Sequence, residues 1–335
     1  MSIKKLKVVW SYPAGFLQDR INGLLSDFCE VVAPKIGNEK ELLTLTADAE
    51  ILLVRRQPFK ITRQLINAGK HLKLIQKIGT LCESIDLHAC KEARIQVATM
   101  PMGVDIGVAE HAMTLMLALG KKLIQAHRAT ANGEYEALGL RPAPTTQLIS
   151  APNWMRLTGL QLSYGKTLGI IGLGEIGIEV AKRARAFGMK IVYYDIRKLS
   201  ESQEEELRVQ HCSLKELLRN ADFVTLHLTH TKETENMIGR EEFCQMKRTA
   251  FFINTSRGGV VDEEALYQAL KGRMIQGAGL DVFKEEPMPK DSPLLKLENV
   301  ILTPHIAYSE SDIGVQGIFE NVLRVSRGET ALNII

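Results

Sequence analysis

The chain of 335 residues lacks long apolar runs and dense patches of one charge. Its longest apolar helical stretch, 108–119, is interrupted by Glu110 and His111 and is too short to cross a bilayer. The 42 Lys and Arg barely outnumber the 39 Asp and Glu, and basic residues cluster only in short pairs. We therefore expect neither a nucleic-acid nor a membrane partner, and the N-terminus shows no signal-peptide pattern.

Cysteine is also scarce, with five residues that form no CxxC pair. An odd number of scattered cysteines argues against a disulfide framework. We expect free thiols in a reducing cytoplasm, and we expect no metal site.

The first third of the chain alternates strand-like and helical patterns. Apolar runs typical of strands cover 6–10, 30–33, 51–54, 72–78 and 95–98, and helical spacing covers 16–28, 40–49, 62–68 and 87–93. Repeated strand–helix units with short links predict a parallel sheet with helices on both faces. Ligands of such sheets approach the carboxyl ends of the strands.

A glycine-rich stretch, 166–177, lies in the middle of the chain. An apolar strand runs into Gly172, Gly174 and Gly177, and a helix begins at once. These glycines allow a tight turn, close approach of a pyrophosphate to the backbone, and close packing of the helix on the strand. A second apolar run ends at Asp195, about 20 residues on, where a carboxylate can accept both ribose hydroxyls. The pattern predicts a dinucleotide site.

The remaining sequence continues the alternation, with strand patterns at 190–194, 222–228, 250–254, 277–283 and 300–305. The tail, 310–335, reads as an amphipathic helix that returns to the first domain. Residues 108–128 have the pattern of one uninterrupted helix, which we interpret as the bridge into the second domain.

The segment 134–164 differs from its surroundings because Pro142, Pro144 and Pro152 interrupt it. A segment this long inside a compact domain is usually functional, so we expect an arm or a lid rather than plain disorder. Its apolar surface would come from Leu148, Ile149, Trp154, Met155 and Leu157.

Three polar residues, Arg257, Glu286 and His305, lie at or just beyond the ends of separate predicted strands, which meet at one edge of a parallel sheet. Hydride reduction of a carbonyl needs a proton donor, and His305 suits this role because imidazole titrates near neutral pH. Glu286 would orient the ring, and Arg257, in a glycine-rich turn that we expect to be flexible, offers a fork for a carboxylate. Plainer roles stay open: His305 as a turn residue, Glu286 as a solvated loop acid, and Arg257 bound to a backbone carbonyl.

The stretches 254–266, 280–287 and 302–307 resemble the signature motifs of the D-isomer-specific 2-hydroxyacid dehydrogenases, and the resemblance covers essentially the whole chain. It implies a Rossmann-type dinucleotide-binding domain inserted in a flavodoxin-like substrate domain, and a homodimer. It also implies that Arg257 binds the substrate carboxylate and that His305 is the acid/base, with Glu286 as its partner.

The same resemblance places the cofactor contacts, including one from Asp281 to the nicotinamide. The full set is Gly172, Gly174, Glu175, Ile176, Gly177, Asp195, Thr229, Thr255, Ser256 and Asp281. Thr229 stands where the family usually has proline. Asp195 favours NAD because its charge would repel a 2′-phosphate, while Arg197 and Lys198 leave room for NADP.

The expected substrate loop departs from the family pattern, because Leu81 replaces the second glycine of a Gly-x-Gly motif. We expect substrate contacts from Arg56, Gly79, Thr80, Leu81 and Arg257. Hints about the substrate conflict. An anionic tail, as in a phosphoglycerate-type substrate, is suggested by Arg55, Arg56 and Lys60. An apolar pocket is suggested by Leu81, Cys82, Met100 and Met102.

We therefore predict a two-domain α/β enzyme, with 1–104 and 307–335 as the substrate domain and 105–306 as the NAD-binding domain. It would interconvert a small-molecule 2-oxo acid and a D-2-hydroxy acid. The main alternative is an NAD(H)-sensing, corepressor-like protein with little turnover. An L-specific lactate- or malate-type enzyme fits less well because a whole domain precedes the glycine turn. Formate- and phosphite-oxidising relatives share the fold and stay open.

Overall fold

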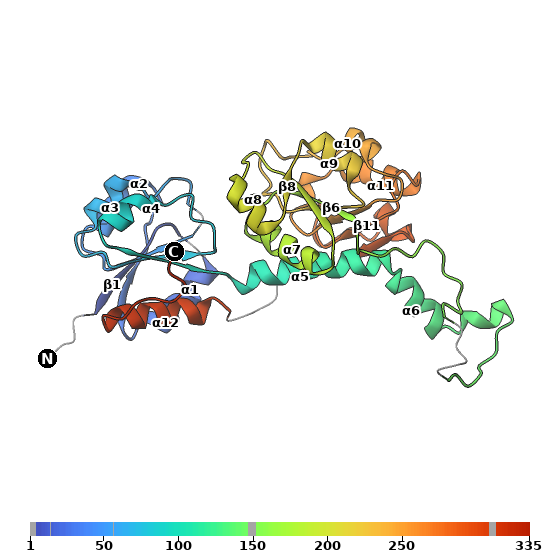
Figure 1. Cartoon of the computed structure of the whole chain (residues 1–335), viewed down its shortest axis with the longest axis horizontal. Helices are drawn as coiled ribbons and strands as arrows, with labels where there is room; N and C mark the ends of the chain where they lie inside the picture. Colours follow the sequence, from blue (N-terminus) through green and yellow to red (C-terminus); the bar gives the residue numbers. More distant parts are fainter. Residues whose placement is uncertain (1–4, 14, 56, 147–151, 308–312) are drawn as a thin grey trace. The chain divides into compact units, whose positions relative to one another are not determined.

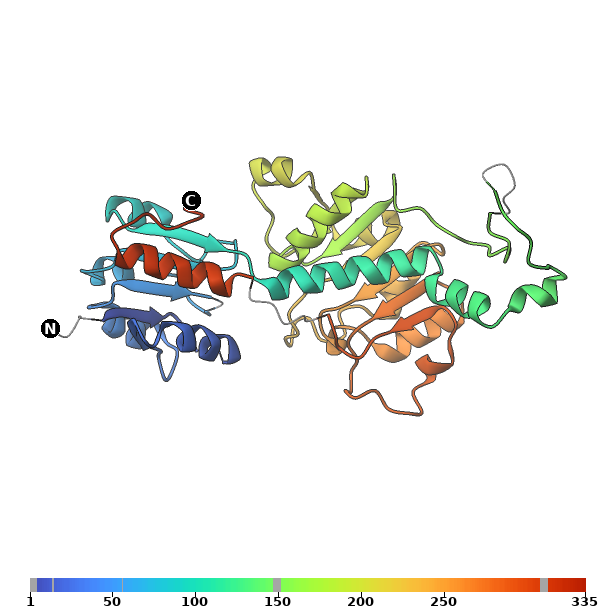
Figure 2. The same ribbon diagram turned by 90° about the horizontal axis from the view of Figure 1, so that it is seen from below.

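The computed structural model describes residues 5–13, 15–55, 57–146, 152–307 and 313–335. The chain divides into unit 1, Met1–Ile106 with Glu310–Ile335, and unit 2, Gly107–Ser309. Each unit has its own parallel sheet with helices on both faces (Figures 1 and 2). This is the α/β class that the alternating pattern predicted.

Unit 1 contains a five-stranded sheet with the order β2-β1-β3-β4-β5, which is the flavodoxin-like order. Its strands are β1 (Leu6–Trp10), β2 (Cys29–Val32), β3 (Ile51–Val54), β4 (Leu74–Ile78) and β5 (Gln96–Met100). Its helices are α1 (Phe16–Leu25), α2 (Glu39–Thr46), α3 (Arg63–Ala68), α4 (Leu87–Glu92) and α12 (Val315–Ser326).

Successive side chains of these strands serve two separate cores, as the pleat of a strand requires. Val8 and Trp10 pack in the core that contains α1 and α12, while Val9 packs with α2, α3 and α4. Figure 1 shows these two helix groups on opposite faces of the sheet. The fully buried Asn321 of α12 donates to Gln76 of β4 at 2.7 Å, so the C-terminal helix is part of unit 1.

Unit 2 contains a seven-stranded parallel sheet with the order β12-β11-β10-β9-β6-β7-β8. The strands are β6 (Thr167–Ile171), β7 (Lys190–Tyr194), β8 (Gln210–His211), β9 (Phe223–Leu226), β10 (Phe251–Asn254), β11 (Gly277–Leu280) and β12 (Val300–Leu302). From β6 the chain adds β7 and β8 on one side, and from β9 it adds strands on the other side. The point between β6 and β9 is therefore the topological switch point, where Rossmann folds bind dinucleotides.

Helices cover both faces of this second sheet. They are α5 (Gly103–Gly120), α7 (Glu175–Ala186), α8 (Glu201–Leu207), α9 (Leu214–Asn220), α10 (Arg240–Gln245) and α11 (Glu263–Lys271), with short 3-10 turns η2 (Gly258–Val260) and η3 (Pro293–Lys296). In Figure 1, α5 and α7 lie on the face opposite to α9, α10 and α11. Gly279 of β11 lets α5 approach closely, because an added Cβ would lie 3.0 Å from Leu115.

The prediction of one helix over 108–128 is wrong. α5 ends at Gly120, Lys122 adopts a left-handed φ of 50°, and α6 (Leu123–Ala131) begins directly after it. The Gly120 carbonyl accepts the N–H of Gln161 at 2.8 Å, so a distant segment satisfies the helix end.

After α6 comes a short 3-10 turn, η1 (Glu134–Leu138), and both lie away from the sheet of unit 2 (Figures 1 and 2). The rings of Tyr135 and Trp154 pack edge to face at 5.7 Å between centroids. Leu148 and Ile149 lie outside the described residues. The arm or lid role of this segment stays a prediction.

Three general features bear on function. No described helix combines the length and the apolar character needed to cross a membrane. The five cysteines, all in described segments, carry free thiols. Within the same part of the chain, His, Cys, Asp and Glu side chains form no group that could hold a metal ion.

Candidate active site

The glycine turn between β6 and α7 has the geometry that a bound pyrophosphate needs. Gly172 has a φ of 93°, and an added Cβ would lie 2.6 Å from the His227 carbonyl oxygen. At Gly177 a Cβ would lie 2.4 Å from the Gly172 oxygen, whereas at Gly174 it would meet nothing within 4 Å. Two glycines therefore allow close packing, and the third leaves open space before α7, which begins with Glu175 and Ile176.

Asp195, at the end of β7, is anchored to this turn. Its carboxylate accepts the N–H of Leu173 at 2.8 Å and the N–H of Arg197 at 2.9 Å. The acid is thereby fixed beside the glycines, as a ribose-binding carboxylate must be. The exposed Ile196, Arg197 and Lys198 come directly after it.

Two buried polar atoms at the same edge have no hydrogen-bond partner among the described residues: Thr255 Oγ1 and His227 Nδ1. Burial lowers the pKa of His227 to about 3, so its ring is neutral. Unsatisfied buried atoms are costly unless a ligand or water meets them. Together with the open turn at Gly174, they fit a dinucleotide lying across this edge.

The turn after β10 is held by Asn254. Its side chain accepts the N–H and the hydroxyl of Ser256 at 3.0 and 2.9 Å and donates to the Arg257 carbonyl at 3.0 Å. An added Cβ at Gly258 would lie 1.9 Å from the Phe283 carbonyl carbon. Glycine at position 258 therefore serves close packing, and the expected flexibility of the turn stays a prediction.

The Arg257 side chain is exposed, and its Nη1 donates to the Ser256 carbonyl at 2.6 Å. This is the plainer role that the sequence left open. A guanidinium has five N–H donors, so one such bond still leaves capacity for a substrate carboxylate.

Glu286 and His305 form a direct pair, with Glu286 Oε2 accepting from His305 Nδ1 at 2.6 Å. Their side chains are 35% and 43% exposed. The other Glu286 oxygen accepts the Phe283 N–H at 3.0 Å. Burial would raise the pKa of Glu286, but the hydrogen bonds from His305 and Phe283 lower it below its usual value. The acid therefore stays a carboxylate and fixes the ring orientation.

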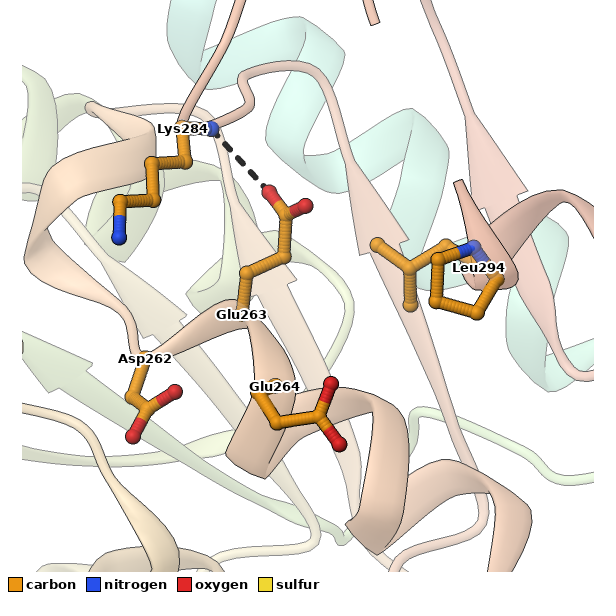
Figure 3. A pocket seen from close by; sticks show the side chains of 6 residues that line it. Asp262, Glu263, Glu264, Lys284 and Leu294 are labelled. Carbon is orange, nitrogen blue, oxygen red and sulfur yellow. Dashed lines mark hydrogen bonds between the residues drawn. The ribbon is translucent and has the colours of Figure 1, made fainter. Parts of the chain in front are cut away.

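The loop that carries Glu286 is also held from α11. Glu263 accepts the Lys284 N–H at 3.1 Å, as Figure 3 shows. The hollow in this view, about 260 Å³, contains none of the predicted site residues. It is lined by Asp262, Glu263, Glu264, Lys284, Pro293 and Leu294.

Asp281, at the end of β11, is fully buried. Its carboxylate accepts the Thr303 hydroxyl at 2.6 Å and the N–H groups of Ile306 and Ala307 at 2.9 Å each. His111 Nε2 lies 3.3 Å away. Burial would raise the pKa of Asp281, but the bonds from His111, Thr303 and the two N–H groups lower it to about 2. The nicotinamide contact expected of Asp281 stays a prediction.

The predicted substrate residues of unit 1 are only partly described. Gly79 has a φ of 109°, and its N–H donates to Met100 at 2.7 Å, so this amide is used within the fold. Thr80 and Leu81 come next and are half-buried, and Arg56 lies outside the described residues. Met100 and Met102 are buried in the core with α12, so these two side chains do not line an open pocket.

The remaining predicted cofactor residues lie at the carboxyl edge of the second sheet. Thr255 and Ser256 are buried directly after β10, and Thr229 is exposed after β9. The Thr229 carbonyl accepts the Thr234 hydroxyl at 2.7 Å. Sequence reasoning missed Asn254, His111 and Thr303 as supports of the site. An Asn two residues before Ser256 is a recognisable turn signal, whereas nothing local marks His111.

A Rossmann sheet with a glycine turn and an anchored acid at one edge is the architecture of a dinucleotide-binding domain. Residues 113–307 match the model of the D-isomer specific 2-hydroxyacid dehydrogenase NAD binding domain. The chain belongs to the D-isomer specific 2-hydroxyacid dehydrogenase family.

Individual relatives agree with this assignment. A D-3-phosphoglycerate dehydrogenase of Methanocaldococcus jannaschii is 40% identical over 318 residues, covering 93% of this chain and 56% of the relative. The chain thus spans little more than half of that protein. A glyoxylate reductase of Korarchaeum cryptofilum is 39% identical over 82% of this chain and 79% of its own. A solved D-lactate dehydrogenase with NAD+ from Lactobacillus jensenii has 26% identity and a TM-score of 0.53, covering 98% and 99% of the two chains.

Proposed function

We propose that the chain interconverts a 2-oxo acid and a D-2-hydroxy acid, using NAD in preference to NADP. The observation that carries this proposal is the 2.6 Å bond between His305 and Glu286 at the edge that also carries the glycine turn. A proton donor beside a nicotinamide site is what carbonyl reduction requires.

NAD(H), when bound, would supply or accept the hydride. Gly172, Gly174 and Gly177 would hold the pyrophosphate, and Asp195 would accept the ribose hydroxyls. Thr255 and Ser256 would line the nicotinamide end, where Thr255 Oγ1 needs a partner. The anchored Asp195 carboxylate is what disfavours a 2′-phosphate.

In the reducing direction, protonated His305 gives a proton to the substrate carbonyl oxygen. Because the Nδ1 hydrogen of His305 is hydrogen-bonded to Glu286, the transferred proton leaves from Nε2. The Glu286 carboxylate stabilises the charged ring before the transfer, and Arg257 binds the substrate carboxylate through its planar fork. In the oxidising direction, neutral His305 takes the hydroxyl proton.

Unit 1 is proposed as the substrate domain, with Arg56 and the loop at Gly79, Thr80 and Leu81, and unit 2 as the NAD-binding domain. The relatives are named for phosphoglycerate, glyoxylate and hydroxypyruvate. We therefore propose a short 2-oxo acid, with a phosphate-bearing one as a candidate because of Arg55 and Arg56.

The test mixes protein, NADH and a panel of glyoxylate, hydroxypyruvate and phosphohydroxypyruvate, and monitors the loss of the reduced-nicotinamide absorbance. We expect turnover on at least one acid and a D-configured product where the product is chiral. Tight NADH binding without turnover on any acid would contradict the proposal and favour the sensor alternative.

We also propose a cytoplasmic homodimer. Exposed apolar side chains in unit 2, such as Trp154 at 40%, Leu162 at 64% and Tyr164 at 77%, support an interface there. Sedimentation velocity of the wild type and of Trp154→Glu tests this. A wild type that sediments as a monomer at every concentration would exclude the dimer.

A further inference from the structure

Behind His305 lies a buried network that includes a second histidine. His111 of α5 is 15% exposed. Its Nε2 lies 3.0 Å from Thr303 Oγ1 and 3.3 Å from Asp281 Oδ1. The chemistry proposed above gives this ring no task.

The direction of each hydrogen bond is set by the chemistry of the groups. The Asp281 carboxylate can only accept, so the Thr303 hydroxyl donates to it at 2.6 Å. That hydroxyl then presents its lone pairs to His111, whose Nε2 must carry the hydrogen. Asp281 therefore receives hydrogens from Thr303, Ile306 and Ala307, and it shares the single His111 Nε2 hydrogen with Thr303.

Two of these donors are the peptide groups that come directly after His305. His305 itself has a left-handed φ of 54°, which a residue with a side chain rarely adopts unless its surroundings hold it there. The position of the His305 ring is thus set by Asp281, and the orientation of Asp281 is set by Thr303 and His111.

We infer that His111 is a positioning residue, which acts through Asp281 to hold the His305 loop in its reactive position; this rests on the proposed role of His305. The chain enters unit 2 along α5, between Ile106 and Gly107, and leaves it again after Ser309. The network therefore joins the helix by which the chain enters unit 2 to the segment by which it leaves.

The test uses His111→Leu, which removes the N–H donor, and His111→Gln, which keeps an amide donor. Glu110→Gln is the matched control, because Glu110 is the exposed neighbour of His111 on the same helix. For each variant, kcat and KM for the 2-oxo acid are measured, with NADH affinity from fluorescence titration. Amide hydrogen exchange at Ile306 and Ala307 is measured by NMR.

For His111→Leu we expect kcat to fall about 10-fold or more, since misplacing a reacting group by a fraction of an ångström is costly. Exchange at Ile306 and Ala307 should accelerate, while NADH affinity stays within about 2-fold, since the nucleotide-binding turn is separate. His111→Gln should restore most of kcat, and Glu110→Gln should match the wild type.

If kcat is unchanged in His111→Leu, the inference is overturned. Accelerated exchange at Ile306 and Ala307 would in that case show that His111 stabilises the loop without affecting the reaction. Equal loss in the Leu and Gln variants would also overturn it, because the donor would then not matter. If the wild type reduces no 2-oxo acid, the proposed function fails. Amide exchange then tests the network alone, and exchange rates in His111→Leu equal to those of the wild type would overturn the network.

Discussion

Among its described residues, unit 2 contains two histidine–carboxylate pairs that differ mainly in their surroundings. His305 and Glu286 are 2.6 Å apart and 43% and 35% exposed. His111 and Asp281 are 3.3 Å apart and 15% and 0% exposed. An accessible pair can exchange protons with a substrate, whereas a buried pair is fixed by the bonds that compensate its burial. We therefore propose that the exposed pair serves the chemistry and that the buried pair serves positioning.

The comparison also predicts that substitutions in the two pairs affect stability to different extents. An ion pair with both members exposed contributes little to folding, because water solvates either partner alone. Asp281 is enclosed, so removing its donors or its charge leaves unsatisfied groups inside the protein. The two pairs can therefore be separated by measuring turnover and stability on the same variants.

The largest effect is expected from His305→Ala. Removing a general acid should lower kcat for the 2-oxo acid by about 10²-fold or more. The free energy of unfolding, from urea titration, should change by less than about 0.5 kcal/mol, since the side chain is half exposed. Near-normal turnover by this variant would remove His305 from the mechanism.

Next in size is Asp281→Asn, which should destabilise the protein by about 2 kcal/mol or more. Asn keeps the shape but turns one acceptor into a donor that faces another donor. Urea unfolding measures the loss, and Asp262→Asn, the N-cap of α11, serves as a carboxyl-to-amide control outside the network. Equal stability of Asp281→Asn and the wild type would contradict the network.

The pH dependence of stability should come from the same carboxylate. The folded-state pKa of Asp281 is lowered to about 2, so its stabilisation is complete above its ordinary pKa of about 4 and is lost as pH falls toward 2. Between pH 5 and about 2, we expect the free energy of unfolding to fall by about 2 kcal/mol more in the wild type than in Asp281→Asn. Parallel urea midpoints for both proteins over this range would argue against it.

A smaller effect is expected from Glu286→Gln. The amide can still accept from His305 but cannot stabilise the charged ring, so kcat should fall about 10-fold. Unfolding free energy should again change by less than about 0.5 kcal/mol. An unchanged kcat across the pH range would show that Glu286 does not assist His305.

Local patterns predicted most of the fold because its elements carry their own signals. The strand predicted at 51–54 and the helix predicted at 87–93 match β3 and α4, and neither needs a distant partner to be recognised. α8 was missed although Ser200 and Gln203 form a capping box that the sequence shows. The break at Lys122 was also missed, although Gly120 and the two lysines after it are a recognisable helix stop; Gln161 supplies the bond to the last carbonyl of α5.

The site divides in the same way. Arg257, Glu286 and His305 could be proposed because each lies at or just beyond a predicted strand end. His111 could not, since it lies 192 residues from Thr303 and reads as an interruption in an apolar helix. The burial of Asp281 was equally hidden, because a carboxylate at a strand end is most simply expected to face a ligand.

The most direct test measures kcat and the free energy of unfolding for His305→Ala and Asp281→Asn side by side. We predict that the first variant loses about 10²-fold in kcat and keeps its stability, while the second loses about 2 kcal/mol or more. A His305→Ala protein that reduces the 2-oxo acid at near the wild-type rate would contradict this account of the two pairs.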